Sequence, residues 1–335
     1  MTKQKTAYRL RNWNQYNRSL IHRGSLTLWI EEGIQEKWLL KDKSGKKGAS
    51  LLYSDFAITV CRSLGIVMRL PLRQSIGLVG SLLALAKLDL PVPDYSTLSR
   101  RSRTLAIDLC VARSASSERS RHLVIDSTGL KVYGEGEWKV RQHGVGKRRT
   151  WRKLHLSVDA DTGEILAAEM TVGDAADGPL LPALVRESAR VGGKLASARA
   201  DGAYDSWEND AFLAQQGIAA LIPPKKGSVI RQRKRAGVVP LPRDERLRAI
   251  RALGGGNFEY GRRRWAKASG YSRRSLVETA MMRQKVILGA ALRSRLEASQ
   301  RCECLLRCQV LNVLTSLGMP DSSPSYALLP GNSTG

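Results

Sequence analysis

His122-Leu-Val-Ile-Asp-Ser-Thr-Gly-Leu-Lys131 is the stretch that gives the clearest indication of the fold. Three apolar residues lead into Asp126 and turn-forming residues follow, which predicts a short buried strand that emerges at the carboxylate. Asp201 is placed in the same way, after Ala196-Ser-Ala-Arg-Ala200 and before a glycine. Functional groups of open α/β sheets collect at the carboxyl ends of strands, so both aspartates are candidate site residues. A single aspartate at such a place is more often a turn residue, which is the alternative for each of them.

The segments that follow the first strand indicate the fold class. Residues 154–158 and 164–172 have strand patterns on either side of the turn Asp161-Thr-Gly, which predicts a hairpin. Four further elements follow: a helix over 179–191, a strand over 196–200, a helix over 206–216 and a strand over 219–222. This order is typical of an RNase H-like (retroviral-integrase-like) α/β core, a mixed sheet with helices packed on it. We assign residues 121–222 to the first part of such a core.

Helical patterns dominate residues 1–120. Ser54 precedes an apolar series with helical spacing, and Pro71 fits the first turn of a second helix. The linker Pro91-Val-Pro-Asp94 leads to a short helix over 96–103 with three clustered cations, Arg100, Arg101 and Arg103. This arrangement predicts a helical DNA-binding domain of helix-turn-helix type. The linker is longer than the standard turn, so a helical bundle with an exposed arginine face is the alternative.

Two segments combine many cations with little regular pattern. Residues 223–270 are rich in Arg, Lys and Gly without a sustained period, which predicts a basic insertion or arm before the last core helix. The loop over 139–153 lies beside Trp138 and Trp151 and contains Arg148, Arg149 and Arg152. Such a loop suits contact with DNA phosphates along a groove. A solvated hairpin is the alternative.

The C-terminal part of the chain divides at Pro320. Residues 271–320 predict the C-terminal core helices, a long one over 272–296 and a shorter one over 305–317. Residues 321–335 are rich in Ser, Pro and Gly, and we expect a disordered tail there.

Charge is distributed unevenly along the 335 residues, whose 55 Lys and Arg against 30 Asp and Glu give a net charge of +25. Residues 1–120 hold 20 basic and 9 acidic side chains, residues 121–222 hold 13 and 14, and residues 223–300 hold 20 and 5. A neutral middle between two basic flanks suits a core that contains carboxylates, held between two surfaces that bind phosphate. A basic surface that only aids solubility is the alternative.

Composition excludes several other classes of protein. Apolar residues make up 42% of the chain, enough for a sizeable core. Apolar stretches such as 76–86 are shorter than the roughly 20 residues of a bilayer span, and residues 1–14 lack the apolar region of a signal peptide. Five cysteines do not make a disulfide scaffold, and the set Cys302, Cys304 and Cys308 has no fourth zinc ligand nearby. We expect a cytoplasmic protein without a membrane partner.

The spacing Tyr271-x2-Arg274-x3-Glu278-x6-Lys285 carries the strongest indication of function. On a helix these four side chains fall within a stripe about 60° wide. One carboxylate between cations is poorly suited to an apolar interface and well suited to facing a metal ion and a phosphodiester together. An exposed i,i+4 ion pair between Arg274 and Glu278 is the alternative.

This spacing resembles the signature of bacterial insertion-sequence transposases of the DDE type. Other blocks resemble their insertion-sequence-five family: residues 122–131, Trp151-Arg-Lys-Leu-His-Leu-Ser-Val-Asp159, Ala200-Asp-Gly-Ala-Tyr-Asp205, Ala220-Leu-Ile-Pro-Pro-Lys-Lys-Gly227, Asn12-Trp-x2-Tyr-Asn17 and Arg23-Gly-Ser-Leu-Thr27. The resemblance extends from about Tyr8 to Pro320 and includes no motif in residues 228–264.

The resemblance implies a catalytic triad of Asp126, Asp201 and Glu278 that holds two divalent ions, Mg²⁺ or alternatively Mn²⁺. Hard oxygen ligands suit Mg²⁺, and two ions could serve both the attacking and the leaving oxygen. Tyr271, Arg274 and Lys285 would position the DNA backbone. Asp205 is a rival ligand, but its place beside Ser206 predicts a cap for the next helix.

We therefore expect a transposase that binds the terminal inverted repeats of its own element and performs metal-dependent cleavage and strand transfer. Its partners would be double-stranded DNA and further copies of itself in a synaptic homo-oligomer, in association with the bacterial nucleoid. An RNase H-like nuclease or resolvase without strand transfer is the alternative. A DNA-binding regulator without enzymatic activity is disfavoured, since it needs no carboxylates that face phosphate.

Overall fold

The computed structural model describes residues 7–30, 33–40, 52–109, 119–132, 151–232 and 239–325. At its centre lies a mixed sheet with the strand order β4-β3-β2-β5-β6. Its strands are β2 (Arg121–Val132), β3 (Trp151–Asp159), β4 (Ile165–Val172), β5 (Leu195–Arg199) and β6 (Ala219–Leu221). β2, β3 and β4 are antiparallel neighbours, whereas β5 runs parallel to β2 and β6 runs parallel to β5. The predicted mixed α/β sheet is confirmed, with strands and helices in the expected order along the chain.

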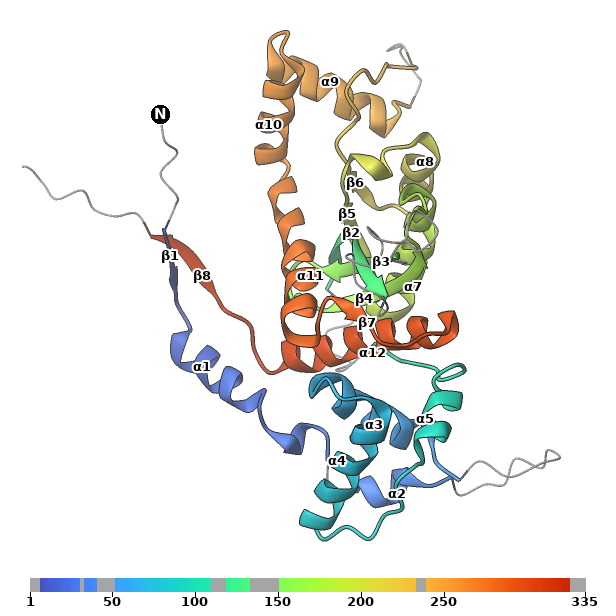
Figure 1. The fold of residues 1–335 in the computed structure, drawn as a ribbon. Helices are drawn as coiled ribbons and strands as arrows, with labels where there is room; N and C mark the ends of the chain where they lie inside the picture. The colour runs from blue at the N-terminus through green and yellow to red at the C-terminus, as the bar shows by residue number, and fades with distance from the viewer. Residues whose placement is uncertain are drawn as a thin grey trace, which may run out of the picture.

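Helices cover both faces of this sheet (Figure 1). α7 (Leu181–Gly192) and α8 (Trp207–Gln215) cover one face, and α11 (Ser275–Leu288) and α12 (Glu297–Ser316) cover the other. Alternation along β2 explains the two cores, because Leu123 and Ile125 pack with α7 while Val124 and Leu130 pack with α11 and α12. A strand buried on both faces reads as a continuous apolar run, as Leu123-Val-Ile does.

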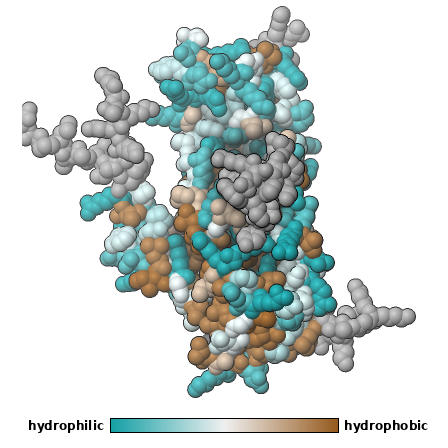
Figure 2. Space-filling model, viewed as in Figure 1, coloured by the Kyte–Doolittle hydropathy of each residue, from teal (hydrophilic) through white to brown (hydrophobic). Residues whose placement is uncertain are grey.

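A second helical unit precedes the sheet along the chain. It contains α3 (Asp55–Val67), α4 (Leu72–Leu85) and α5 (Tyr95–Arg101), after α1 (Trp13–His22), the 3₁₀ turn η1 (Leu26–Leu28) and α2 (Ile34–Trp38). Ser54 caps α3 as its sequence position predicts, since its hydroxyl accepts a bond from the amide of Ala57. Apolar side chains of this unit gather with Cys302 and Leu306 of α12. The N-terminal helices are therefore packed on the last helix of the core, and apolar residues show on their surface in Figure 2.

The segment expected as a basic arm without regular structure is helical where it is described. α9 (Pro242–Gly254) and α10 (Phe258–Ala268) lie side by side, and a Cβ added at Gly261 would lie 2.9 Å from the Cα of Gly254. The helical period was hidden because Arg243 and Arg246 occupy buried positions usually held by apolar residues. Each is neutralised there by a buried aspartate of the core, Asp205 and Asp210 respectively.

Three further expectations about the C-terminal part are corrected. The long helix expected over 272–296 ends at Leu288, where Gly289 takes a φ of 94°, and a two-residue strand β7 (Ala291–Leu292) pairs with the end of β2. α12 begins at Glu297, earlier than the predicted 305. Residues Ser322–Ser325 of the expected disordered tail form β8, which pairs with β1 (Ala7–Leu10); residues 326–335 lie outside the described part.

Candidate active site

Asp126 and Asp201 lie on neighbouring strands of the sheet. Asp126 is inside β2 and not at its end, which corrects the expectation, because β2 continues in antiparallel pairing with β3. The parallel pairing with β5, however, stops at Val124 opposite Arg199. Continued by two residues, that register places Asp126 beside Asp201, on the same face of the sheet. The two aspartates thus mark the point where β2 and β5 separate.

Asp201 lies two residues after the end of β5 and is the N-cap of the 3₁₀ turn η4 (Gly202–Tyr204). Its Oδ1 accepts a hydrogen bond from the amide of Ala203 at 2.8 Å. This bond fixes the carboxylate at the start of the turn, and no described residue donates a hydrogen bond to its second oxygen. Tyr204 is the last residue of this turn and its side chain is buried. Burial raises the pKa of Tyr204, and Asp177, Asp126 and Asp201 contribute to the rise. Tyr204 is therefore a neutral, buried neighbour of the two aspartates.

The four residues of the predicted stripe do not lie on a single helix. Tyr271 and Arg274 belong to the 3₁₀ turn η5 (Tyr271–Arg274), while Glu278 lies in the first turn of α11 and Lys285 near its end. Arg274 of the turn and Lys285 of α11 nevertheless both reach β2. Arg274 Nη1 lies 2.6 Å from Asp126 Oδ2, and its Nη2 pairs with Glu278. Lys285 Nζ donates to Thr128 Oγ1 at 2.6 Å.

Thr128 is a contact that sequence reasoning missed. It lies two residues after Asp126, so the two side chains share a face of β2. That period of two was a signal available in the sequence. The remaining residue of the predicted set, Tyr271, packs its ring against Trp265 with the ring centroids 5.7 Å apart. Burial raises the pKa of the Tyr271 phenol, so it stays protonated at neutral pH.

Negative charge converges at Asp126. Burial raises the pKa of this carboxyl most, and the carboxylates of Asp201 and Glu278 raise it further against the opposing amide of Ser127 and guanidinium of Arg274. Burial lowers the pKa of Arg274, but Tyr271, Asp126 and Glu278 outweigh it and the pKa is raised. The site thus combines three acidic groups with one cation that neutralises two of them.

The oxygen donors suit a hard divalent cation, because all three acidic side chains are carboxylates. In the described part of the chain, no three side chains of Asp, Glu, His or Cys stand together closely enough to hold a metal ion. The guanidinium of Arg274 lies between two of the three carboxylates, those of Asp126 and Glu278. A metal ion held by Asp126 and Glu278 would therefore have to displace this arginine from both carboxylates.

Asp205, the rival ligand, is committed elsewhere. Its carboxylate forms a bidentate pair with Arg243, at 2.8 and 2.7 Å, and accepts the amide of Lys225. The side chain has no exposed surface. Ser206, the next residue, caps α8 by accepting from the amide of Asn209. Asp205 therefore joins the core to α9.

The arginines proposed for DNA contact differ in their surroundings. Arg100 and Arg103 are exposed, whereas Arg101 pairs with Asp55 and donates to the Tyr53 carbonyl at 2.8 Å. Arg152 donates to Gln300 Oε1 at 2.8 Å and joins β3 to α12. Arg101 and Arg152 thus have structural contacts. The other two predicted arginines, Arg148 and Arg149, lie outside the described residues.

Comparison with known protein families decides the family of the chain. Two family models, each described as a transposase DDE domain, match residues 21–135 and residues 117–313. The second match alone covers more than half of the chain. The chain belongs to the DDE transposases. This transposase accordingly cleaves DNA and transfers strands, and the predicted function is confirmed at that level.

A solved structure similar to this transposase is titled "Cryo-EM structure of piggyBac transposase synaptic complex with hairpin DNA (SNHP)". The match has 11% sequence identity and a TM-score of 0.38, and it covers 89% of this chain and 74% of the other. Among the described residues of the transposase, no helix combines the length and the apolar character needed to cross a membrane.

Proposed function

We propose that Asp126, Asp201 and Glu278 are the metal-binding triad of this transposase, in an RNase H-like core of the insertion-sequence-five type. The observation that carries the proposal is the contact of Arg274 with both Asp126 and Glu278. It joins the middle strand of the sheet to α11, across about 150 residues of sequence. Asp201 lies beside Asp126 through the register of β2 and β5. The three carboxylates thus come from three separate elements, and Asp126 feels the charge of both Asp201 and Glu278.

Magnesium, or manganese in its place, would supply charge stabilisation for the attacking and the leaving oxygen of an in-line displacement at phosphorus, with two ions bound. The side chains of Asp126, Asp201 and Glu278 would hold these ions. Burial raises the pKa of Asp126 most, and the carboxylates of Asp201 and Glu278 add a smaller rise that a bound cation would offset. These residues bind and orient, and the reacting oxygens come from water or DNA.

Arg274 and Lys285 supply positive charge on the DNA side of the triad. When the guanidinium of Arg274 leaves Asp126 and Glu278, its two parallel N–H donors are free to bind a phosphate. A planar guanidinium binds phosphate well in this two-bond geometry. Lys285 already reaches Thr128, two residues from Asp126. Both cations therefore lie where the scissile phosphate must bind. Tyr271, held against Trp265, fixes the start of the turn that carries Arg274.

The reaction has two steps at one site. Water attacks the phosphodiester at the end of the element and frees a 3′-hydroxyl, and this hydroxyl then attacks a phosphodiester of target DNA. Residues 1–120 would bind the terminal inverted repeats of the element. Synapsis of two ends would bring at least two copies of the chain together, and the DNA would be that of a bacterial nucleoid.

A cleavage and joining assay tests the triad. The purified full chain is incubated with a labelled duplex that carries an end of its element and with Mg²⁺, and both nicked and joined products are scored. Asp126→Ala, Asp201→Ala and Glu278→Ala are each expected to abolish both products while leaving binding of the duplex in EDTA, without metal, intact. Asp174→Asn, at an exposed aspartate, is the control and should cleave as the parent does. Mg²⁺-dependent cleavage by any of the three variants would remove that residue from the triad.

A further inference from the structure

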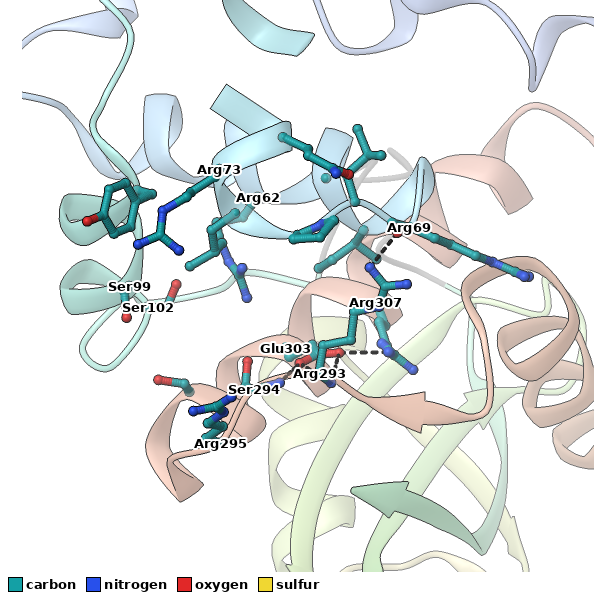
Figure 3. Close-up of a pocket in the computed structure, with 18 of the residues that line it drawn as sticks. Arg62, Arg69, Arg73, Ser99, Ser102, Arg293, Ser294, Arg295, Glu303 and Arg307 are labelled. Carbon is teal, nitrogen blue, oxygen red and sulfur yellow. Dashed lines mark hydrogen bonds and ion pairs between the residues drawn. The ribbon is translucent and has the colours of Figure 1, made fainter. Parts of the chain in front are cut away.

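A cavity of about 1000 Å³ lies between the N-terminal helices and the last part of the core. Its walls come from the end of α3 and the start of α4, from α5, and from the segment that joins β7 to α12. Figure 3 shows side chains of these elements facing one another across the cavity. We call it the interdomain cleft. It is separate from the carboxylate site described above.

Positive charge dominates the lining of the interdomain cleft. Among the described residues, six arginines line it and Glu303 is the one carboxylate. This carboxylate is already bound, because it accepts the amides of Arg293 and Ser294 and pairs with Arg307 at 2.6 Å. Glu303 is therefore not available to neutralise the other arginines.

Three of the six arginines are held by hydrogen bonds of the fold, and two of them, Arg69 and Arg293, join the two walls. Arg69 donates to the Ile287 carbonyl at 3.0 Å, and Arg293 donates to the carbonyl of Arg69. Arg307 donates to the Gly289 and Ala291 carbonyls at 2.9 and 2.6 Å. Arg69 also adopts a left-handed φ of 52°, a conformation that non-glycine residues rarely take. These contacts make the cleft a built feature of the fold.

The other three arginines are available to a ligand. For Arg62, Arg73 and Arg295, the described part of the chain provides no acidic partner. The Nε atom of Arg62 is buried without a hydrogen-bond acceptor, and unsatisfied buried donors of this kind are rare in folded proteins. Arg73 lies over the ring of Tyr95, 4.1 Å from its centroid, which orients its guanidinium. Arg295 is exposed.

Two helix N-termini add donors to the same lining. α4 begins at Leu72 and α12 begins at Glu297, and neither has a side-chain cap. Residues of both starts, among them Arg73 and Ser299, line the cleft. The amides of a first helical turn are unpaired and carry partial positive charge, so they bind phosphate. Two such starts and three unneutralised arginines form a site for an anion with several phosphates.

We propose that the interdomain cleft binds the phosphodiester backbone of the duplex whose cleavage occurs at the carboxylate site. This inference rests on the function proposed above. Lys131 of β2 pairs with Ala291, two residues before Arg293, and it lies five residues from Asp126. At about 3.3 Å per residue, that is about 17 Å, or roughly five base pairs of duplex. Phosphates near the cleaved bond would therefore reach the cleft.

The salt dependence of DNA binding tests this proposal. A 30-base-pair duplex of arbitrary sequence is titrated with the full chain in EDTA between about 50 and 200 mM salt. In the triple variant, Arg62, Arg73 and Arg295 are replaced by Gln. Each phosphate contact contributes about 0.9 to the slope of log K against log salt, so we expect the slope to fall by two to three. Binding should also weaken at least roughly tenfold. The double variant Arg73→Gln/Arg295→Gln, at two exposed positions, should lose about two of these units. Arg186→Gln, an exposed arginine on α7, is the matched control and should leave the slope unchanged.

The outcomes separate this proposal from the proposed function. A double variant that remains folded and binds with the slope of the parent overturns the cleft proposal, whatever the triad variants do. A second arm uses tripolyphosphate alone as ligand. If the arginine variants lose tripolyphosphate binding but keep the parental slope for DNA, the cleft binds a small polyphosphate and the proposal is wrong. Cleavage by a triad variant, in contrast, would overturn the proposed function and not the binding of DNA in the cleft.

Discussion

Arg274 donates to Asp126 across 2.6 Å and at the same time pairs with Glu278, so one guanidinium lies between two of the three proposed metal ligands. In the DNA-free chain this arginine does what a metal ion would do, because it neutralises carboxylates that would otherwise repel each other. Metal ion and arginine therefore compete for the same oxygens. The phosphate of bound DNA offers the displaced guanidinium a new partner. Binding of metal and binding of DNA should consequently support each other.

Removing this arginine should strengthen the binding of metal to the DNA-free chain. Partly exposed ion pairs contribute up to about 1 kcal/mol each, so we expect Arg274→Gln to bind Mn²⁺ roughly tenfold more tightly. Calorimetric or electron-paramagnetic titration with Mn²⁺ measures the change. The same variant should cleave DNA more slowly, since it lacks the phosphate-binding group. The neighbouring Arg273→Gln is the control, and equal Mn²⁺ affinity for parent and Arg274→Gln would contradict the competition.

The buried pair of Asp205 and Arg243 should contribute to stability and not to chemistry. Both side chains are at least nine-tenths buried and the carboxylate receives two guanidinium bonds. Asp205→Ala leaves the arginine charge buried without a partner, which typically costs about 3–5 kcal/mol of the free energy of unfolding. Urea denaturation measures this loss. Folded protein of this variant, selected at low temperature, should still cleave DNA, whereas a role of Asp205 as metal ligand would leave it inactive.

The hairpin turn after β3 should show a defined pH dependence through Asp161. Burial opposes ionisation of this carboxyl, but the guanidinium groups of Arg273 and Arg119 outweigh burial and the pKa is lowered from 3.8. A lowered pKa in the folded state stabilises the fold above pH 3.8, and this stabilisation is lost as the pH falls through the folded-state value. Asp161→Asn should therefore unfold more easily than the parent at pH 7, by about 1 kcal/mol, with the difference shrinking below pH 4. A difference that stays constant down to pH 2.5 would contradict the assignment.

Two glycines offer a matched test of the contact between α9 and α10. A Cβ at Gly261 would meet backbone atoms of Gly254 at 2.9 Å and the Ile250 carbonyl still more closely, whereas a Cβ at Gly77 in α4 meets nothing within 4 Å. Gly261→Ala should lower the free energy of unfolding by about 1–3 kcal/mol through overpacking. Gly77→Ala should raise it by up to about 1 kcal/mol, because alanine favours the helix. Thermal denaturation of both variants gives the comparison, and two changes of the same sign would contradict the close packing.

The central sheet could be predicted from the sequence because each strand has a residue pattern that can be recognised within a few neighbouring positions. Leu123-Val-Ile is a run buried on both faces, and the turn Asp161-Thr-Gly separates two clear strands. Glu278 and the residues around it could be found because a short spacing contains them all. These features depend on residues that are close together in sequence, and such local patterns can be read from a single sequence.

What could not be predicted depends on contacts distant in sequence. The helix α9 was hidden because buried Arg243 and Arg246 find aspartates that lie 38 and 36 residues earlier in the chain. The strand β8 exists through pairing with β1, more than 300 residues away. The break of the last helices at Gly289 similarly follows from the pairing of β7 with β2. These three features leave no local sequence pattern, because each depends on residues that are distant along the chain.

α12 covers two apolar surfaces at once, and it is one of the last parts of this transposase to be synthesised. Cys302 and Leu306 complete the apolar cluster of the N-terminal helices, while Cys304, Cys308 and Leu311 pack against the sheet. The ribosome makes these five residues after every strand of the central sheet and after every helix they cover. Until then, a nascent chain carries two uncovered apolar surfaces that chaperones and proteases recognise. A chain that stops before residue 297 is therefore a substrate for degradation rather than a shorter enzyme.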